Sequence, residues 1–233
     1  MAPHAPPEEM LVDYAAGNLA EPLALLVATH ASLNRESRRE VQLLESVGGA
    51  MLETLPPAEM SDGALDSVLA QMDDTDAGGD GDGASSSMVG EAAPPSGGSA
   101  PTQVQNDGVP APLRPYVGSD LHALPWRERG GSVAEYRFLD GRNGYRTRLM
   151  RIRAGCKVPS HTHRGCEYTL VIEGGFSDTQ GDYFPGDVAV ADADVTHQPV
   201  AWPDRDCICL TVLDAPVRMT GPMGRILNLF VDF

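Results

Sequence analysis

Three histidines and one glutamate are spaced as metal ligands in the second half of this 233-residue chain. His161 and His163 are two residues apart, so on a β-strand their side chains point to the same face. Glu167 follows four residues later, and His197 comes after a further β-rich stretch, from where it can approach across a barrel. Imidazole and carboxylate suit zinc, iron, manganese, nickel or copper better than calcium. The sequence therefore predicts one divalent metal held by these four residues.

The number of ligands bears on what such a site can do. Four protein ligands around zinc close a tetrahedral shell, and the site is then structural or sensory. Iron, manganese or nickel with six-fold coordination would leave positions open for substrate and dioxygen. Zinc is our first candidate, with iron, manganese and nickel as alternatives. We assign no catalytic residue. The acid–base candidates nearby are Tyr168 and Glu173, and by strand alternation their side chains either face away from the metal ligands or lie far from them.

The elements around these ligands read as strands. Short β-rich stretches separated by Gly, Pro and Asp turns cover residues 132–139, 145–154, 167–174, 186–192 and 207–215. Several such strands without intervening helices predict a sandwich or closed barrel. The spacing from Gly155 to Gly174 resembles the first cupin motif, and residues 181–200 resemble the second more loosely. The resemblance implies an all-β cupin barrel, that is, a double-stranded β-helix.

The first part of the chain has a helical period instead. Apolar residues spaced three or four apart form one stripe of Leu23, Leu26, Val27 and His30, and a second of Val41, Leu44, Gly48, Met51, Leu52 and Leu55. Pro56-Pro57 ends the second helix, and Ser61-Asp62 can start a last one that carries Leu65, Val68, Leu69 and Met72. We expect a small helical bundle with a small core.

Composition divides the chain into three parts. Residues 73–112 are rich in Gly, Ser, Pro and Asp and contain no aromatic residue, which predicts a disordered acidic linker. The expected organisation is a helical domain at 1–72, the linker at 73–112 and a cupin domain at 113–233, an α+β multidomain chain. No apolar run is long enough to span a membrane, and the start lacks the features of a signal peptide, so we expect a cytoplasmic protein with reduced cysteines.

Charge also separates these parts. The formal net charge is −16, and residues 1–72 carry 11 acidic and 3 basic side chains, whereas residues 113–233 are nearly balanced. A strongly acidic chain is a poor partner for nucleic acid, whose phosphates require clustered Lys and Arg. The acidic first third is either a solvating surface or the binding face for a basic partner.

Residues 10–52, with LALLVATH as the most specific stretch, resemble the ChrR family of anti-sigma factors. The resemblance extends through the metal motif to VTHQPV and to GPMGRILNLF near the end. It implies a zinc-type anti-sigma domain in residues 1–72 that sequesters an extracytoplasmic-function sigma factor. It also implies a cupin that is needed to release the sigma factor on an oxidative signal such as singlet oxygen.

One departure from the family concerns its helical zinc site, which has the pattern His-x3-Cys-x2-Cys with a further His near the N-terminus. Here His30 is followed by Asn34 and Ser37, while His4 remains in place. Amide and hydroxyl groups are poor zinc ligands compared with thiolate. We predict that this domain binds no zinc, or binds it weakly through His4 and His30, which are otherwise a tail residue and an interior helix residue.

Other interpretations stay open at this point. Cys207 and Cys209 face one way on a strand and are either a redox or metal-binding pair or two small apolar side chains inside the barrel. Cys156 and Cys166 flank the metal motif and could be oxidised if exposed. The alternative function is a metal-dependent cupin enzyme, a dioxygenase or isomerase, with an appended helical module. A chain that keeps the shape without binding a sigma factor, and a homodimer through the cupin, are further alternatives.

Overall fold

A computed structural model describes residues 4–76, 108–215 and 217–219 of the chain. The chain divides into two compact units, one of residues 1–51 and 106–233 and one of residues 52–105. Most of the predicted linker, residues 77–107, lies outside the described residues, as does the stretch 221–230 that contributes to the family resemblance. The domain boundaries at 72 and 112 therefore stay a prediction.

Three helices precede the barrel: α1 (Glu8–Ala15), α2 (Glu21–Leu33) and α3 (Arg35–Glu53). Pro22 lies in the first turn of α2, where its fixed φ favours the helix and its missing N–H costs nothing. Short turns η1 (Ala111–Leu113), α5 (Arg114–Val117) and η2 (Arg142–Gly144) belong to the same unit, and α4 (Ala64–Asp76) lies in the other. None of the helices in these described parts is long and apolar enough to cross a membrane.

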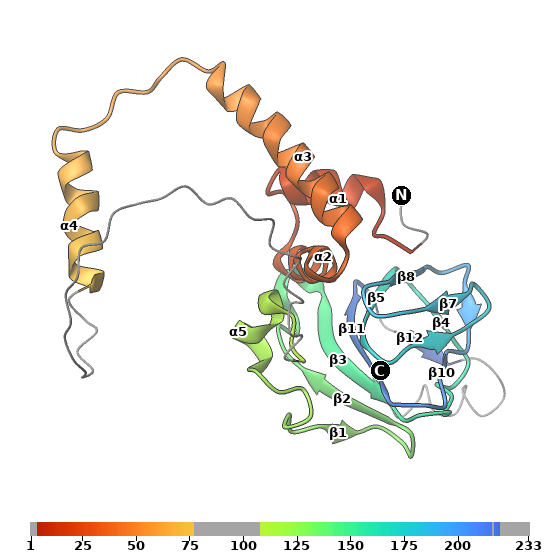
Figure 1. The fold of residues 1–233 in the computed structure, drawn as a ribbon. Helices are drawn as coiled ribbons and strands as arrows, with labels where there is room; N and C mark the ends of the chain where they lie inside the picture. The colour runs from red at the N-terminus through yellow and green to blue at the C-terminus, as the bar shows by residue number, and fades with distance from the viewer. Residues whose placement is uncertain (1–3, 77–107, 216, 220–233) are drawn as a thin grey trace, which may run out of the picture. The chain divides into compact units, whose positions relative to one another are not determined.

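The barrel consists of antiparallel strands in three sheets (Figure 1). The largest has the order β1-β2-β3-β11-β5-β8, formed by Arg127–Glu128, Val133–Arg137, Arg146–Ile152, Cys207–Leu213, Glu167–Glu173 and Val188–Ala191. The two smaller sheets have the orders β10-β6-β7, formed by Val200–Ala201, Phe176–Ser177 and Asp182–Tyr183, and β12-β4-β9, formed by Val217–Met219, His161–His163 and Thr196–His197. All five predicted β-stretches are strands, so the predicted β-barrel is confirmed.

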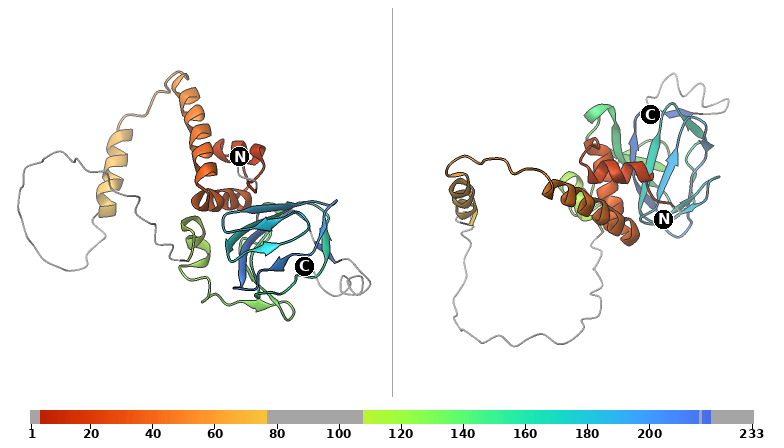
Figure 2. Two further views of the ribbon diagram at one scale, coloured as in Figure 1. Left: turned by 45° about the vertical axis from the view of Figure 1, so that its right-hand side comes forward. Right: turned by 90° about the horizontal axis from the view of Figure 1, so that it is seen from above.

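The large sheet is buried on both faces. Side chains alternate along β11, and all seven of its residues are buried. Cys207 belongs to the hydrophobic cluster inside the barrel, whereas Ile208 and Leu210 belong to a second cluster that contains the helices. The helices therefore pack on the outer face of the sheet whose inner face lines the barrel (Figure 2).

The apolar stripe of α2 provides the helical side of this outer core. Leu26 and Val27 are completely buried, and α2 contacts η1, η2 and β11. Gly186, in the turn before β8, allows the closest approach, because a Cβ built there would lie 3.3 Å from Leu33 Cβ at a φ of +95°. The predicted helix with a buried face is confirmed here, and its partner is the barrel.

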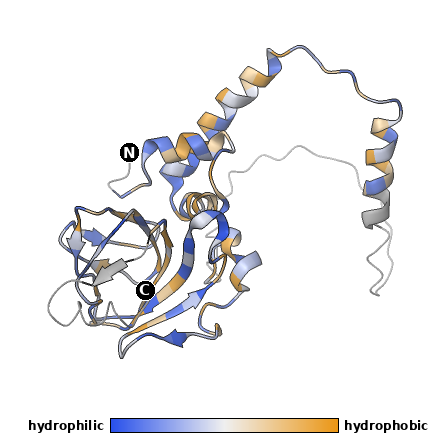
Figure 3. Ribbon diagram, turned by 180° about the vertical axis from the view of Figure 1, so that it is seen from behind, coloured by the Kyte–Doolittle hydropathy of each residue, from blue (hydrophilic) through white to orange (hydrophobic). Residues whose placement is uncertain are grey.

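The second predicted stripe is helical but mostly exposed. Val41 is buried and Leu44 is half-buried, whereas Met51 and Leu52 on α3 are about two-thirds exposed. The predicted apolar residues of α4, Leu65 to Met72, are exposed as well. Apolar residues recur along both helices in Figure 3. Most side chains of these two stripes are exposed in the described residues, and the buried ones join the core between α2 and the barrel.

Candidate metal centre

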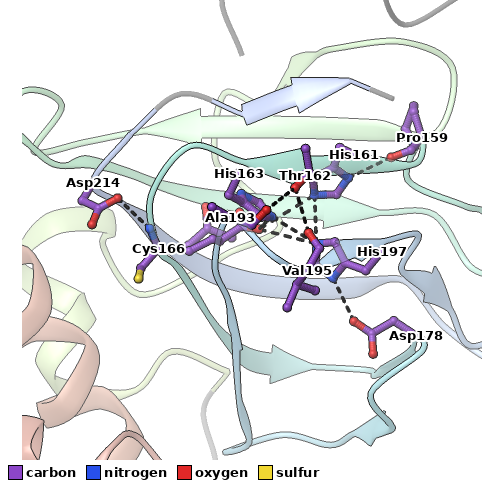
Figure 4. A network of polar contacts seen from close by, with 12 residues as sticks. Pro159, His161, Thr162, His163, Cys166, Asp178, Ala193, Val195, His197 and Asp214 are labelled. Carbon is purple, nitrogen blue, oxygen red and sulfur yellow. Dashed lines mark hydrogen bonds and ion pairs between the residues drawn. The ribbon is translucent and has the colours of Figure 1, made fainter. Parts of the chain in front are cut away.

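The structure brings the four predicted metal ligands together. Figure 4 shows the three histidines gathered at this point. His161 and His163 lie on β4 and point to one face, and His161 pairs directly with His197 on the neighbouring strand β9. Glu167 begins β5, one short turn after β4. One ligand-type atom from each of the four lies within 4.8 Å of the others, and all four side chains are buried.

The separations between these atoms fit a single ion. His197 Nε2 lies 3.0 Å from His161 Nε2 and 3.2 Å from His163 Nε2, and Glu167 Oε2 lies 3.3 Å from His163 Nε2. Ligands about 2.1 Å from a tetrahedral metal lie roughly 3.4 Å from one another. The cluster therefore has the dimensions of a metal shell before any ion is considered.

Hydrogen bonds on the far side of two rings fix where the lone pairs point. His161 Nδ1 lies 2.8 Å from the Pro159 carbonyl oxygen, and His197 Nδ1 lies 2.9 Å from Asp178 Oδ2. The carbonyl and the ionised carboxylate can only accept, so each Nδ1 carries the proton and donates it. Each Nε2 then presents a lone pair, and two lone pairs 3.0 Å apart repel each other unless a cation lies between them. A bound metal ion removes this conflict.

The protonation states also suit a metal. Burial alone would raise the pKa of Glu167, but His161 and His163 outweigh it and hold the pKa at about 2, so the carboxylate is ionised. Burial lowers the pKa of His163, which favours the neutral ring that can act as a ligand. For Asp178, hydrogen bonds from His197 and from Gln180 N–H outweigh the effect of burial and lower its pKa.

The acid–base candidates of the enzyme hypothesis lie away from this cluster. Tyr168 packs against the helix-side core on the outer face of the sheet. Glu173 Oε2 lies 3.4 Å from His122 Nε2, at the opposite end of β5 from Glu167. Neither side chain is placed to transfer a proton at the metal.

The family's helical zinc positions form a hydrogen-bonded corner between α2 and α3. His30 is completely buried, its Nδ1 lies 2.7 Å from the Gly186 carbonyl oxygen, and its Nε2 lies 2.8 Å from Ser37 Oγ. Asn34 Oδ1 accepts from the backbone N–H groups of Glu36 and Ser37, which caps the first turn of α3. Both ring nitrogens of His30 are thus engaged in hydrogen bonds, and the absence of zinc from this corner stays a prediction.

His4 is held by the barrel. Its ring lies 4.5 Å from that of Tyr183 between centroids, and its carbonyl oxygen accepts from Val188 N–H. Among the described residues, neither His4 nor His30 belongs to a group of three or more side chains that could hold a metal. A weak site made by this pair stays a prediction without support from their contacts.

The cysteine pair faces the barrel interior. Cys207 and Cys209 are free and buried, and Cys209 lines the cavity beside the metal cluster. The neighbouring Cys207 and burial raise the pKa of the Cys209 thiol, which disfavours the reactive thiolate. Cys156 and Cys166 are half-buried, and Cys166 N–H donates to Asp214 Oδ1. A redox role for any of them stays a prediction.

Sequence reasoning missed three charged residues of the barrel. Asp178 orients His197 from 19 residues away along the chain, in a turn whose acidic composition gives no indication of this role. Glu135 and Arg148 lie on β2 and β3 with their side chains turned into the barrel. Charged residues such as Glu135 and Arg148 within stretches of β-strand composition were the signal that could have indicated these roles.

The fold and the buried cluster define the class of protein: a metal-site cupin with helices packed on its outer sheet. The family model described as "ChrR Cupin-like domain" matches residues 116–216. Anti-sigma-E factor ChrR of Cereibacter sphaeroides is 37% identical over 227 residues, which cover 97% of both chains. The chain therefore belongs to the ChrR family of anti-sigma factors.

A solved structure matches across both the helices and the barrel. The crystal structure of Rhodobacter sphaeroides SigE in complex with the anti-sigma ChrR aligns with 91% of this chain and 98% of that chain, at 35% identity and a TM-score of 0.70. These relatives carry the name of an anti-sigma factor and not of an enzyme, which agrees with the prediction of a non-enzyme.

Proposed function

We propose that this chain is a cytoplasmic anti-sigma factor that sequesters an extracytoplasmic-function sigma factor through residues 1–72. The observation that carries the proposal is the full-length similarity to ChrR, which was crystallised in complex with SigE. The similarity covers nearly the whole chain, which includes the helices that we propose as the binding part. A cytoplasmic location belongs to the proposal, because a sigma factor acts on RNA polymerase.

Exposed apolar faces on the helices support a protein partner. On α3 the large apolar side chains that are more than half exposed are Leu43, Val47, Met51 and Leu52, and on α4 they include Leu65, Val68 and Met72. Contiguous exposed apolar surface of this kind marks interaction sites. The acidic surplus of residues 1–72 complements the basic surface with which a sigma factor contacts DNA.

We propose further that the barrel holds one divalent metal, zinc first, and takes part in releasing the sigma factor on an oxidative signal such as singlet oxygen. The ligands are His161, His163, Glu167 and His197, which together fit one ion. A path to the helices exists, because β5 carries Glu167 on its inner face and Leu170 and Ile172 in the helix-side core. A cupin enzyme receives no comparable support, since Tyr168 and Glu173 lie away from the cluster.

Co-purification tests the partner. The full chain should co-purify with an extracytoplasmic-function sigma factor expressed beside it and should inhibit transcription from that factor's promoter. Leu43→Asp with Val47→Asp places charge on the exposed face of α3 and should weaken binding about 30-fold or more, as expected for interface hot spots of 2 kcal/mol. Gln42→Asp adds one negative charge at an exposed polar position of the same helix and should bind normally. A double variant that binds like the wild type argues against this face.

Illumination of the purified complex with a photosensitiser tests the signal. The wild-type complex should release the sigma factor, which can be followed by the return of transcription. The His161→Ala/His163→Ala variant should still bind the sigma factor but retain it under illumination. Release at the wild-type rate from this variant would exclude the metal centre from the response.

A further inference from the structure

The barrel contains a cavity of about 360 Å³ next to the metal cluster. Its apolar walls include Val133, Met150, Ile152, Val158 and Phe176. This volume lies at the lower end of the range of roughly 300–1,000 Å³ for small-molecule sites. At the ~30 Å³ that one water molecule occupies in the liquid, the cavity holds on the order of ten non-hydrogen atoms.

A surplus of positive charge lies in one wall of this cavity. The buried carboxylate of Glu135 receives Arg129 Nε at 2.6 Å, Arg137 Nε at 2.7 Å and Arg148 Nη1 at 3.2 Å. Arg137 also reaches Asp140, at 3.5 Å. Because Arg137 also pairs with Asp140, Glu135 is, among the described residues, the one carboxylate hydrogen-bonded to the two cavity-lining arginines, Arg129 and Arg148. A buried cation is costly unless an anion compensates it.

Arg148 is the buried member of this set. It is 5% exposed, and its remaining contact is a long hydrogen bond of 3.4 Å from Nε to Thr211 Oγ1. Neither this contact nor the one to Glu135 uses Nη2. A guanidinium with free N–H capacity binds a carboxylate in a two-pronged geometry.

Arg148 is also close to the metal cluster. It lines the same cavity as His161, Glu167 and His197. Lys157, an exposed residue, lines the cavity too and adds a further positive charge. With Glu167 directed at the metal position and Glu135 occupied by arginines, the field inside the cavity favours an anion.

We propose that the barrel cavity binds a small organic anion, a carboxylate with an apolar body, whose charged group lies at Arg148 beside the metal cluster. The apolar body packs against Met150, Ile152 and Phe176. This ligand site goes beyond the sequestration of a sigma factor and does not require it, because the cavity lies inside the barrel.

Calorimetry on the full-length, zinc-loaded chain tests the proposal, with octanoate as the probe and octan-1-ol as its uncharged counterpart. Octanoate should bind with a Kd at least tenfold below that of octan-1-ol. Arg148→Met keeps the length of the side chain but removes its charge, and it should weaken octanoate binding at least tenfold without changing octan-1-ol binding. Arg153→Met, at an exposed arginine just beyond β3, should change neither.

Equal affinity for the two probes, no binding of either, or wild-type octanoate affinity in Arg148→Met would overturn the proposal. If Arg148→Met does not fold, Arg129→Met replaces it, because Glu135 then keeps two arginines. In that variant an octanoate Kd raised at least threefold supports the site, and an unchanged Kd overturns the proposal. Metal content and sigma binding are measured separately, so failure of the anti-sigma proposal is distinguishable from failure of this one.

Discussion

The barrel cluster and the α2–α3 corner are both built around buried histidines, yet they are organised in opposite ways. In the barrel, Pro159 and Asp178 hold the Nδ1 protons of two histidines, and the Nε2 lone pairs converge on one point. In the corner, both ring nitrogens of His30 are hydrogen-bonded, one to the Gly186 carbonyl oxygen and the other to Ser37 Oγ. The comparison shows that the presence of histidine does not by itself make a metal site. The ring nitrogens must have free lone pairs that point to one position.

The largest expected difference between the two regions is in metal content. The wild-type chain should hold about one metal ion, the His161→Ala/His163→Ala variant none, and His30→Ala one, as measured by elemental analysis after dialysis. The converging lone pairs exist only in the barrel, so only their loss should abolish binding. One tightly held metal ion in the double variant would indicate a second metal site in the corner and would contradict the difference between the two regions.

Stability should show the reverse pattern. His30→Ala removes two buried hydrogen bonds and leaves a cavity between α2 and the barrel, so we expect the free energy of unfolding to fall by about 2–4 kcal/mol. Urea denaturation of the metal-loaded chain measures this, with His122→Ala as the control, because that imidazole is two-thirds exposed. A loss below about 0.5 kcal/mol would mean that the corner is not a structural joint.

The pH dependence of stability should distinguish His30 from an ordinary histidine. Burial lowers its pKa, although the Gly186 carbonyl and Asp187 act in the other direction. Just below pH 6.5 the unfolded state therefore binds more protons than the folded state. The contribution of neutral His30 to the free energy of unfolding is complete above pH 6.5. It is lost as the pH falls, by at most about 1.4 kcal/mol per pH unit. His30→Gln should flatten the profile between pH 5 and 7, whereas His122→Gln should not. Identical profiles for the wild type and His30→Gln would contradict the assignment.

The smallest effect should come from the cap of α3. Asn34→Ala removes the side-chain oxygen that accepts from the N–H groups of Glu36 and Ser37, at a cost of about 1 kcal/mol in the free energy of unfolding. Asn34→Asp restores an acceptor and should recover most of it. An Asn34→Ala variant as stable as the wild type would show that this position is a relic without a structural role.

The metal centre and the strands could be predicted from sequence because their determinants are local. His161 and His163 share a face by the two-residue period of a strand, and the nearly continuous apolar run of residues 207–213 is typical of a strand buried on both sides. What covers the outer side could not be predicted, since Ile208 and Leu210 meet α2 across more than 170 residues of chain. Asp178 was missed for a similar reason, because it lies in a turn and its partner His197 lies on a strand 19 residues further along the chain.

The apolar stripe of α3 shows the limit of periodicity. Spacing correctly indicates a helix with an apolar face, as for α2, but it does not say whether that face meets the protein's own core or another molecule. Val41 turns toward the core, whereas Val47 lies in solvent. The two helices also differ in composition, because α2 is apolar over most of its surface and α3 is polar apart from one apolar face.

The composition of the hydrogen-bonded corner also limits where oxidants can modify thiols in this chain. All four cysteines follow residue 155, and no thiol lies in the helical part of the sequence. The α2–α3 joint therefore contains no thiol, and thiol modification of this chain acts on the barrel part of the sequence. Within this unit the helices meet the barrel at the outer face of the large sheet and at the turn before β8, where His30 contacts Gly186.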